Sequence, residues 1–234
     1  MALHYTKSEL YNKVHQYKDY LGFNTDEFGL DLVPYCKEFG FLIGAASFNT
    51  KGLRGMATVS TDGYSDAIVL NSNRGYLEQN FDCGHEMIHL GIHRDLKQKY
   101  FRCMDKFYSN RDGYVEWQAN EGAAELLIPY EVFISLIGTY DFKSYRDIRL
   151  FKEYACSLFN VSNMVIEYRL EGLKYEIHQY LNGTPMKDIQ ILSISRQQEK
   201  KINVKSINAL EYDFYIKETD SWNSSSHFIN FESL

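Results

Sequence analysis

The chain carries Phe81-Asp82-Cys83-Gly84-His85-Glu86-Met87-Ile88-His89-Leu90, which contains the pattern His-Glu-x-x-His. Residues four apart lie on the same face of a helix. His85 and His89 can therefore direct two imidazole nitrogens at one metal ion. Glu86 is placed to take a proton from a water on that metal, as a general base. The alternative is an amphipathic helix that carries two histidines by chance, and it is disfavoured because the whole chain has only seven His.

Length and composition are those of a soluble globular protein. The 234 residues are 44% hydrophobic and 24% charged, enough for one large domain or for one domain with an appendage. The net charge of −6 argues against a protein whose main task is to bind phosphate backbones. The start does not resemble a signal peptide, no apolar run is long enough to cross a membrane, and four scattered cysteines indicate reduced thiols. We therefore expect a cytoplasmic protein with no membrane association.

Hydrophobic periodicity predicts a helical start, a β-rich section and then mostly helices. Two helices are expected at 8–20 and 25–39 and the motif helix at 76–91, and residues 94–113 are expected to be loop with a short helix at most. Between them, short runs at 41–48, 55–59 and 66–70 predict an antiparallel meander. Further helices are expected at 114–127, 130–137, 144–159 and 162–182, then strands at 189–194 and 212–216 and a loose end at 221–226.

A catalytic zinc site needs a third protein ligand. Asp95 could supply a carboxylate, whereas His93 lies too far along the helix axis and is expected at the surface or behind a ligand. Glu116 is the better candidate, because small residues after it let its helix pack closely on the motif helix. Asn120, one turn further on, would hydrogen-bond a metal-bound histidine. Glu121 and Glu125 face other directions and are expected in solvent or paired with Lys or Arg.

Together, the two helices resemble the ImmA/IrrE family of metallopeptidases. That family joins Phe-x-x-x-His-Glu-x-x-His to a helix reading Glu-x-x-Ala-Asn-x-Phe-Ala-x-x-Leu-Leu-x-Pro, and the matching stretches here are 81–89 and 116–129. The resemblance covers about residues 25–135 and extends weakly to 159–170, where members often carry a helix-turn-helix-like segment. Gly122 departs from the pattern because it stands in place of Phe, so we expect a gap that a Tyr or Phe from elsewhere must fill.

The sequence pattern and the resemblance together predict an α+β fold in three parts. By the resemblance, residues 1–140 would form a zincin-like metallopeptidase core with a short antiparallel sheet and the HExxH helix, and 141–184 a helical, helix-turn-helix-like segment. Residues 185–234 have no counterpart in the family pattern, and the strands expected there predict a small β-containing C-terminal extension of unknown role. Zn²⁺ would be held by His85, His89 and Glu116, with Glu86 as the catalytic base. Tyr114 and His93 are candidate oxyanion donors, because they are close to the motif in the sequence.

Family members are implicated in inactivating a repressor of a phage or mobile element. The resemblance therefore implies a zinc-dependent metalloendopeptidase that cleaves one regulatory protein, a helix-turn-helix repressor. The alternative is a zinc-binding regulator that inactivates its partner by binding without proteolysis. A third hypothesis is DNA binding by residues 144–182, but 143–174 holds only six basic residues against four acidic ones. Such a small surplus makes direct nucleic-acid binding an unfavoured function.

Overall fold

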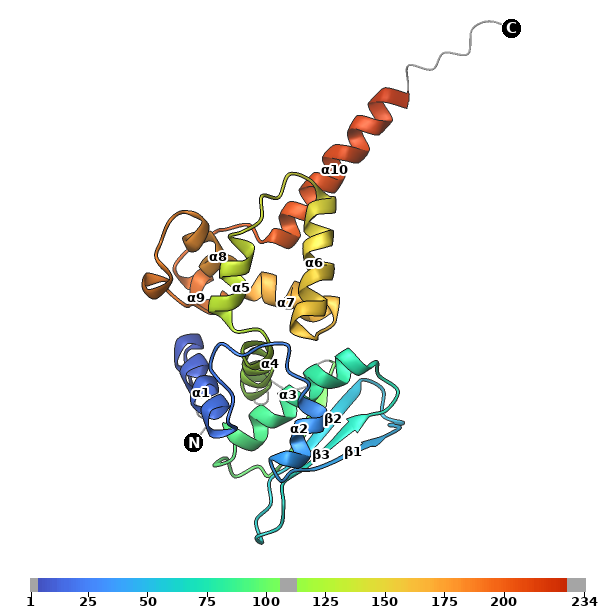
Figure 1. Ribbon diagram of the computed structural model, residues 1–234, viewed down its shortest axis with the longest axis vertical. Coiled ribbons are helices and arrows are strands. Elements are labelled where there is room, and N and C mark those ends of the chain that lie inside the picture. The colour runs from blue at the N-terminus through green and yellow to red at the C-terminus, as the bar shows by residue number, and fades with distance from the viewer. Residues whose placement is uncertain (1–3, 106–112, 227–234) are drawn as a thin grey trace, which may run out of the picture.

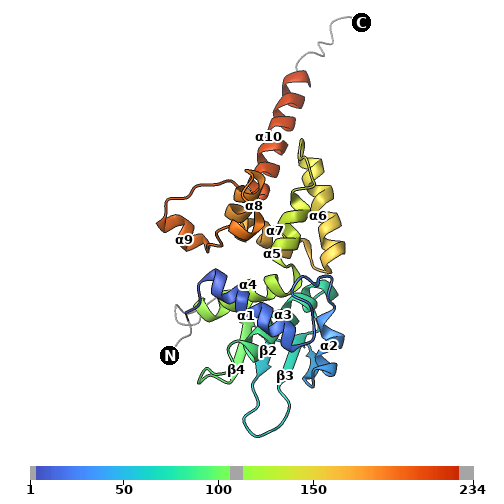
Figure 2. The same ribbon diagram turned by 60° about the vertical axis from the view of Figure 1, so that its left-hand side comes forward.

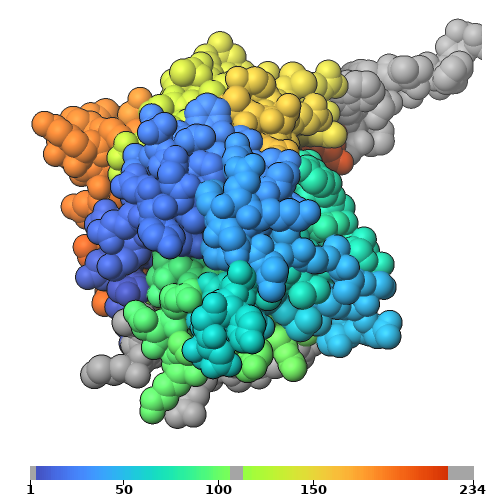
Figure 3. All heavy atoms as spheres, turned by 60° about the horizontal axis from the view of Figure 1, so that its bottom comes forward, coloured from blue at the N-terminus to red at the C-terminus, as the bar shows by residue number. Residues whose placement is uncertain are grey.

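The structure, a computed structural model, describes residues 4–105 and 113–226. Its first half places a four-stranded sheet beneath a layer of helices, and the predicted α+β class is confirmed (Figure 1). Helices α1 and α2 cover one side of this half, as the space-filling view shows (Figure 3). The elements of this half are α1 (Lys7–Tyr20), α2 (Leu32–Glu38), β1 (Leu42–Ala46), β2 (Leu53–Thr58), β3 (Ala67–Asn71), α3 (Tyr76–Gly91), β4 (Tyr100–Met104) and α4 (Gly113–Leu127).

The predicted antiparallel meander is wrong, because the sheet is mixed and its strands do not lie in sequence order. The strands run β1-β3-β2-β4, with β3 parallel to β1 and antiparallel to β2. Strands β3 and β2 are the two inner strands, and Ile68 and Leu70 on one face of β3 are fully buried. The fourth strand was predicted as loop, yet its alternation of buried Phe101 and Cys103 with exposed Tyr100 and Arg102 is typical of a half-buried strand.

Helix α3 is the buried centre of the first half. It packs on one face of the sheet and against α4, and every residue from Asn80 to Leu90 is buried. No gap is left at Gly122, contrary to the prediction, because the Ile88 side chain occupies the space. A Cβ added at Gly122 would lie 3.1 Å from Ile88 atoms. Gly122 and Ile88 therefore let α3 and α4 approach closely.

The second half is helical throughout its described part (Figures 1 and 2). The predicted C-terminal β extension is wrong, since residues 189–193 have no strand and 212–216 lie inside a long final helix. The predicted helix over 162–182 breaks at Leu173, and the predicted loose end at 221–226 is helical. The elements are α5 (Tyr130–Ile137), α6 (Tyr145–Phe159), α7 (Asn163–Gly172), α8 (Lys174–Leu181), the 3₁₀ helix η1 (Met186–Asp188), α9 (Ile194–Glu199) and α10 (Ile207–Ser226).

Helix α10 forms because its contacts repeat with the period of a helix. Ile207, Glu211 and Phe214 are at least half-buried on the side facing α6 and α7, and the Glu211 carboxylate lies 2.6 Å from the Lys152 ammonium. The aromatic run that suggested a strand is thus divided between a packed and an exposed helix face.

The division of the chain at residues 140 and 184 stays a prediction. None of the helices described is both long and apolar enough to cross a lipid bilayer.

A buried ionic cluster joins the two halves. Glu121 and Glu125 on α4 are buried, so the expectation that they are solvated is wrong. Their expected pairing with a basic residue is seen, because the fully buried Arg169 of α7 donates to both carboxylates and to the Ile128 carbonyl oxygen. The ammonium of Lys7 in α1 lies 3.8 Å from Glu121. Helix α4 is therefore fixed in place by charges from both sides.

Candidate metal centre

Helix α3 presents two histidine rings from the same face. His85 and His89 are fully buried, and their Nε2 atoms lie 3.1 Å apart. The helix is held rigidly because Gly84 lies against Leu32 of α2 and Ala123 of α4, where a larger side chain would not fit. Both imidazoles are therefore positioned by the packing of a buried helix.

Helix α4 brings the carboxylate of Glu116 to the same point. Glu116 Oε2 lies 3.2 Å from His85 Nε2, and Oε1 lies 3.4 Å from His89 Nε2. Burial alone would raise the pKa of Glu116, but the contacts with the two rings lower it to about 2. Burial lowers the pKa of His89 to about 4. At neutral pH the cluster thus offers a carboxylate and a neutral imidazole, the forms that bind metals.

These three side chains fit a zinc ion. Their facing atoms are 3.1–3.4 Å apart. Adjacent ligand atoms of a tetrahedral zinc site are separated by about 3.3 Å, given bonds of about 2.0–2.1 Å. Among the described residues Glu116 Oε2 accepts no well-formed hydrogen bond, although His85 Nε2 lies 3.2 Å away, and such burial is costly unless a cation compensates it. Two imidazoles and one carboxylate also leave a fourth position open, as in catalytic zinc sites.

Glu86 lies beside this cluster with a carboxylate that is completely buried. Neither of its oxygens accepts a well-formed hydrogen bond from the described residues, although the Cys103 backbone N–H lies near enough to lower its pKa in part. Burial, and after it the neighbouring carboxylates of Glu116 and Asp82, raise the pKa of Glu86 well above its usual 4.5. A group that favours its protonated form in this environment is suited to accept and hold a proton.

Gly55 in β2 makes room for Glu86, and sequence reasoning missed it. A Cβ at Gly55 would lie 2.8 Å from Glu86 Oε1. A glycine inside a strand often marks a close approach of another group, so the sequence did contain a signal. Its partner, however, comes from a different element and could not be inferred.

Behind His89, His93 and Gln118 continue a chain of hydrogen bonds. His93 Nδ1 lies 2.9 Å from His89 Nδ1, and His93 Nε2 lies 2.8 Å from the Gln118 side-chain oxygen. Burial, followed by the nearby His89, lowers the pKa of His93 to about 3. The Phe101 ring stacks on His89 at 4.3 Å. His93 thus contacts His89 at the ring nitrogen that faces away from Glu116.

Behind His85, Asn120 takes the corresponding place. Its side-chain oxygen lies 3.0 Å from His85 Nδ1 and also accepts a hydrogen bond from Arg54.

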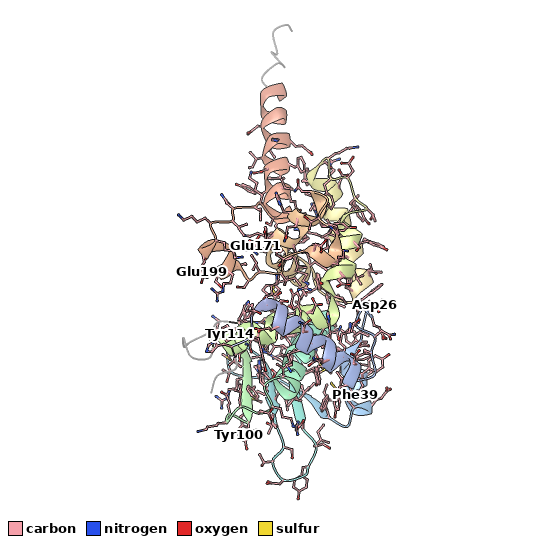
Figure 4. The ribbon with its side chains drawn as sticks, turned by 90° about the vertical axis from the view of Figure 1, so that its left-hand side faces the viewer. Asp26, Phe39, Tyr100, Tyr114, Glu171 and Glu199 are labelled. Carbon is pink, nitrogen blue, oxygen red and sulfur yellow. The ribbon has the colours of Figure 1, made fainter. Side chains whose placement is uncertain are left out.

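Two other residues predicted for the site, Tyr114 and Asp95, lie elsewhere. Tyr114 lies at the start of α4 (Figure 4). Its hydroxyl donates to the Tyr5 carbonyl, and Asp95 is exposed at the surface. A second group of metal-ligating residue types within the described chain consists of His85, Glu86 and Cys103, and it has His85 in common with the first group.

Comparison with known proteins identifies the family of the chain. Residues 36–171 match the family model described as IrrE N-terminal-like domain, Peptidase_M78. Among curated protein sequences, none matches the chain. A solved structure described as a Mycobacterium tuberculosis transcriptional regulator is similar with 17% sequence identity and a TM-score of 0.46. That similarity covers 70% of this chain and 47% of the regulator, so the chain spans about half of the regulator's length.

The matched region contains the motif helix and Glu116, and it extends over more than half of the chain. The expected resemblance is therefore confirmed. The His-His-Glu cluster is consistent with the HExxH zinc site of a metallopeptidase. The chain belongs to the IrrE N-terminal-like domain family, the ImmA/IrrE metallopeptidases.

Proposed function

We propose that the chain is a zinc-dependent endopeptidase that cleaves one regulatory protein. The observation that carries this proposal is the unpartnered carboxylate of Glu86 beside His85, His89 and Glu116. A bound zinc ion would polarise the scissile carbonyl and lower the pKa of a water molecule toward about 7. His85, His89 and Glu116 hold that ion in this proposal.

Glu86 moves the proton in this mechanism. Its buried carboxylate takes the proton of the attacking water and later passes it to the nitrogen of the leaving amine. The raised pKa of Glu86 favours the step in which the carboxyl group holds the proton. Gly55 leaves the space in which that carboxylate lies. His93 and Tyr114, the earlier candidates for oxyanion donor, hydrogen-bond His89 and the Tyr5 carbonyl, so another group is needed for that role.

We propose a helix-turn-helix repressor of a phage or mobile element as the substrate. The family resemblance supports this choice. Charge supports it too, because a protein with a net charge of −6 attracts the basic surface with which such repressors bind DNA. Association of the two proteins should therefore weaken as salt increases.

One observation favours the second candidate function, inactivation of the partner by binding alone. His85, His89 and Glu86 are each 0% exposed. A peptide cannot reach fully buried groups without some opening of the protein, so in this alternative the partner binds at the surface and is not cleaved. In that case zinc would stabilise a binding surface.

The substitution Glu86→Gln separates the two functions. Glutamine keeps the shape of the side chain but cannot act as a base, so the variant should keep its zinc and lose cleavage of the repressor. The measurements are zinc content by elemental analysis and repressor fragments by mass spectrometry. An intact, stable complex with both wild type and variant would support binding alone, and full cleavage by the variant would exclude the hydrolytic mechanism.

A further inference from the structure

Arg54 lies where β2 departs from regular pairing with β4. Leu53 pairs with Met104 and Gly55 pairs with Cys103, so Arg54 is the extra residue of a β-bulge. Bulges redirect a side chain and are over-represented next to active sites. Here the redirected guanidinium reaches the residues behind His85.

The guanidinium of Arg54 makes three kinds of contact. Its Nη2 donates to Asn120 Oδ1 at 3.2 Å and to Cys103 Sγ at 2.7 Å, and its Nε donates to Cys103 Sγ at 3.0 Å. Its Nε also lies 3.3 Å from Asp82 Oδ1, while Arg74 Nε bonds the other Asp82 oxygen at 2.6 Å. These contacts fix the guanidinium in the protein interior and direct it at Asn120.

The contact with Asn120 determines how its amide is oriented. An asparagine amide can present either its oxygen or its NH₂ group, whereas an arginine can only donate hydrogen bonds. The oxygen must therefore face Arg54. The same oxygen lies 3.0 Å from His85 Nδ1, so that nitrogen must carry its hydrogen. His85 Nε2, which faces Glu116 and His89, is left with its lone pair.

We propose that Arg54 is a positioning residue for the metal centre, because it prevents the Asn120 amide from turning over. A reversed amide would donate to His85 Nδ1 and favour the tautomer that carries its hydrogen on Nε2. That tautomer cannot bind a metal through Nε2. Arg54 thus acts on His85 through Asn120, and it touches neither the metal ligands nor a substrate.

This inference rests on the proposed zinc site and not on peptide cleavage, and its test uses no substrate. The variant Arg54→Gln keeps a polar side chain but can accept a hydrogen bond, so the Asn120 amide becomes free to turn over. Zinc affinity, measured by competition with a chelator, should fall by about 10- to 100-fold, the usual effect of losing a residue that orients a ligand. In metal-free protein with ¹⁵N-labelled histidine, NMR should show a mixture of His85 tautomers in place of one.

A second substitution distinguishes orientation from mere structural support. Asn120→Asp presents an oxygen in either orientation, so in the Arg54→Gln background it should restore both the Nδ1–H tautomer of His85 and most of the zinc affinity. A defect in packing would not be rescued in this way. Arg74→Gln is the matched control, because it removes a guanidinium from Asp82 without touching Asn120. Its zinc affinity should stay within about twofold of wild type, well below the loss expected for an orienting residue.

Two results would overturn the proposal. One is an Arg54→Gln protein with wild-type zinc affinity and a single His85 tautomer. The other is a weakened Arg54→Gln protein in which Asn120→Asp restores neither property. If the zinc measurements agree with expectation but wild type fails to cleave any repressor, the role of Arg54 stands and only the proposed peptidase function fails.

Discussion

The Glu86 carboxylate depends on the absence of a side chain at Gly55. The substitution Gly55→Ala would place a methyl group 2.8 Å from Glu86 Oε1, and the flexible end of Glu86 would have to move. We expect the variant to fold and to bind zinc, but to cleave at least about tenfold more slowly, or about 1.4 kcal/mol in barrier. Gly44→Ala in β1 is the control, because a Cβ there meets nothing within 4 Å. Equal loss of cleavage in both variants would contradict this role for Gly55.

The buried histidines also predict how stability depends on pH. The pKa of His89 is lowered to about 4 and that of His93 to about 3, from 6.5, so below 6.5 the unfolded chain takes up two protons that the folded chain does not. Glu86 opposes this, because its pKa is raised in the folded state. Between about pH 5 and 6.5, metal-free protein should therefore become more stable as the pH rises, by less than the roughly 2.7 kcal/mol per pH unit that two protons alone would give.

Urea unfolding in the presence of a chelator measures this dependence. The contribution of the two histidines is fully present above their unfolded pKa and is lost as the pH falls. His93→Gln removes one of the two protonating groups, so its stability should rise less steeply with pH over the same range than that of wild type. A wild-type stability that decreases as pH rises through this range would show that Glu86 outweighs the histidines.

Among single residues, those whose role follows from their spacing along one helix could be predicted from the sequence. His85 and His89 lie one helical turn apart, so their meeting needs no knowledge of the fold. Glu116 was found because its own helix carries a recognisable pattern. The role of Arg54 could not be found in this way, because it depends on the bulge between β2 and β4, which only the assembled sheet defines. Gly55 signals a close approach of another group, but its partner Glu86 comes from a different element.

Among elements, the helices were predicted better than the sheet, but not all of them correctly. The helix expected at 25–39 is helical only over Leu32–Glu38, and the one expected at 162–182 breaks at Leu173. The motif helix and the helix of Glu116 lie within a few residues of their predicted limits. The order of strands was wrong because β3 inserts between β1 and β2, and nothing in the local sequence specifies that choice. The aromatic residues of 212–216 suggested a strand, but packing against α6 and α7 overrides that preference.

The contact of Gly122 with Ile88 is a second case in which packing between two elements could not be predicted from the sequence of either one. Comparison with the family pattern predicted a gap at Gly122, since Phe is usual there. In the structure, Ile88 of α3 fills the space, and a larger residue on α4 would collide with it. Complementary changes on two helices cannot be recognised from either helix alone.

In the whole molecule, Arg169 holds the two halves together through buried charges. Arg169→Met would leave Glu121 and Glu125 without their guanidinium, and uncompensated buried carboxylates are costly. We expect the free energy of unfolding to fall by about 3–5 kcal/mol, measured by urea denaturation. Arg196→Met is the control, because the Arg196 side chain is 62% exposed, and it should change stability by less than about 0.5 kcal/mol. A comparable effect of both substitutions would show that the cluster contributes little.

This link between α4 and α7 was not visible in the sequence. The carboxylates of α4 and the arginine of α7 are more than forty residues apart, and each lies on a helix that could have faced solvent. The helix that carries Glu116 is thus positioned partly by a segment outside the motif region. The metal centre therefore belongs to the whole molecule and not to two helices alone.

The central claim is that His85, His89 and Glu116 hold one zinc ion. The most direct measurement is anomalous diffraction at the zinc edge from crystals of the zinc-loaded protein. We expect one peak within about 2.0–2.2 Å of His85 Nε2, His89 Nε2 and a Glu116 carboxylate oxygen. A peak elsewhere, or no peak at this cluster at saturating zinc, would contradict the account.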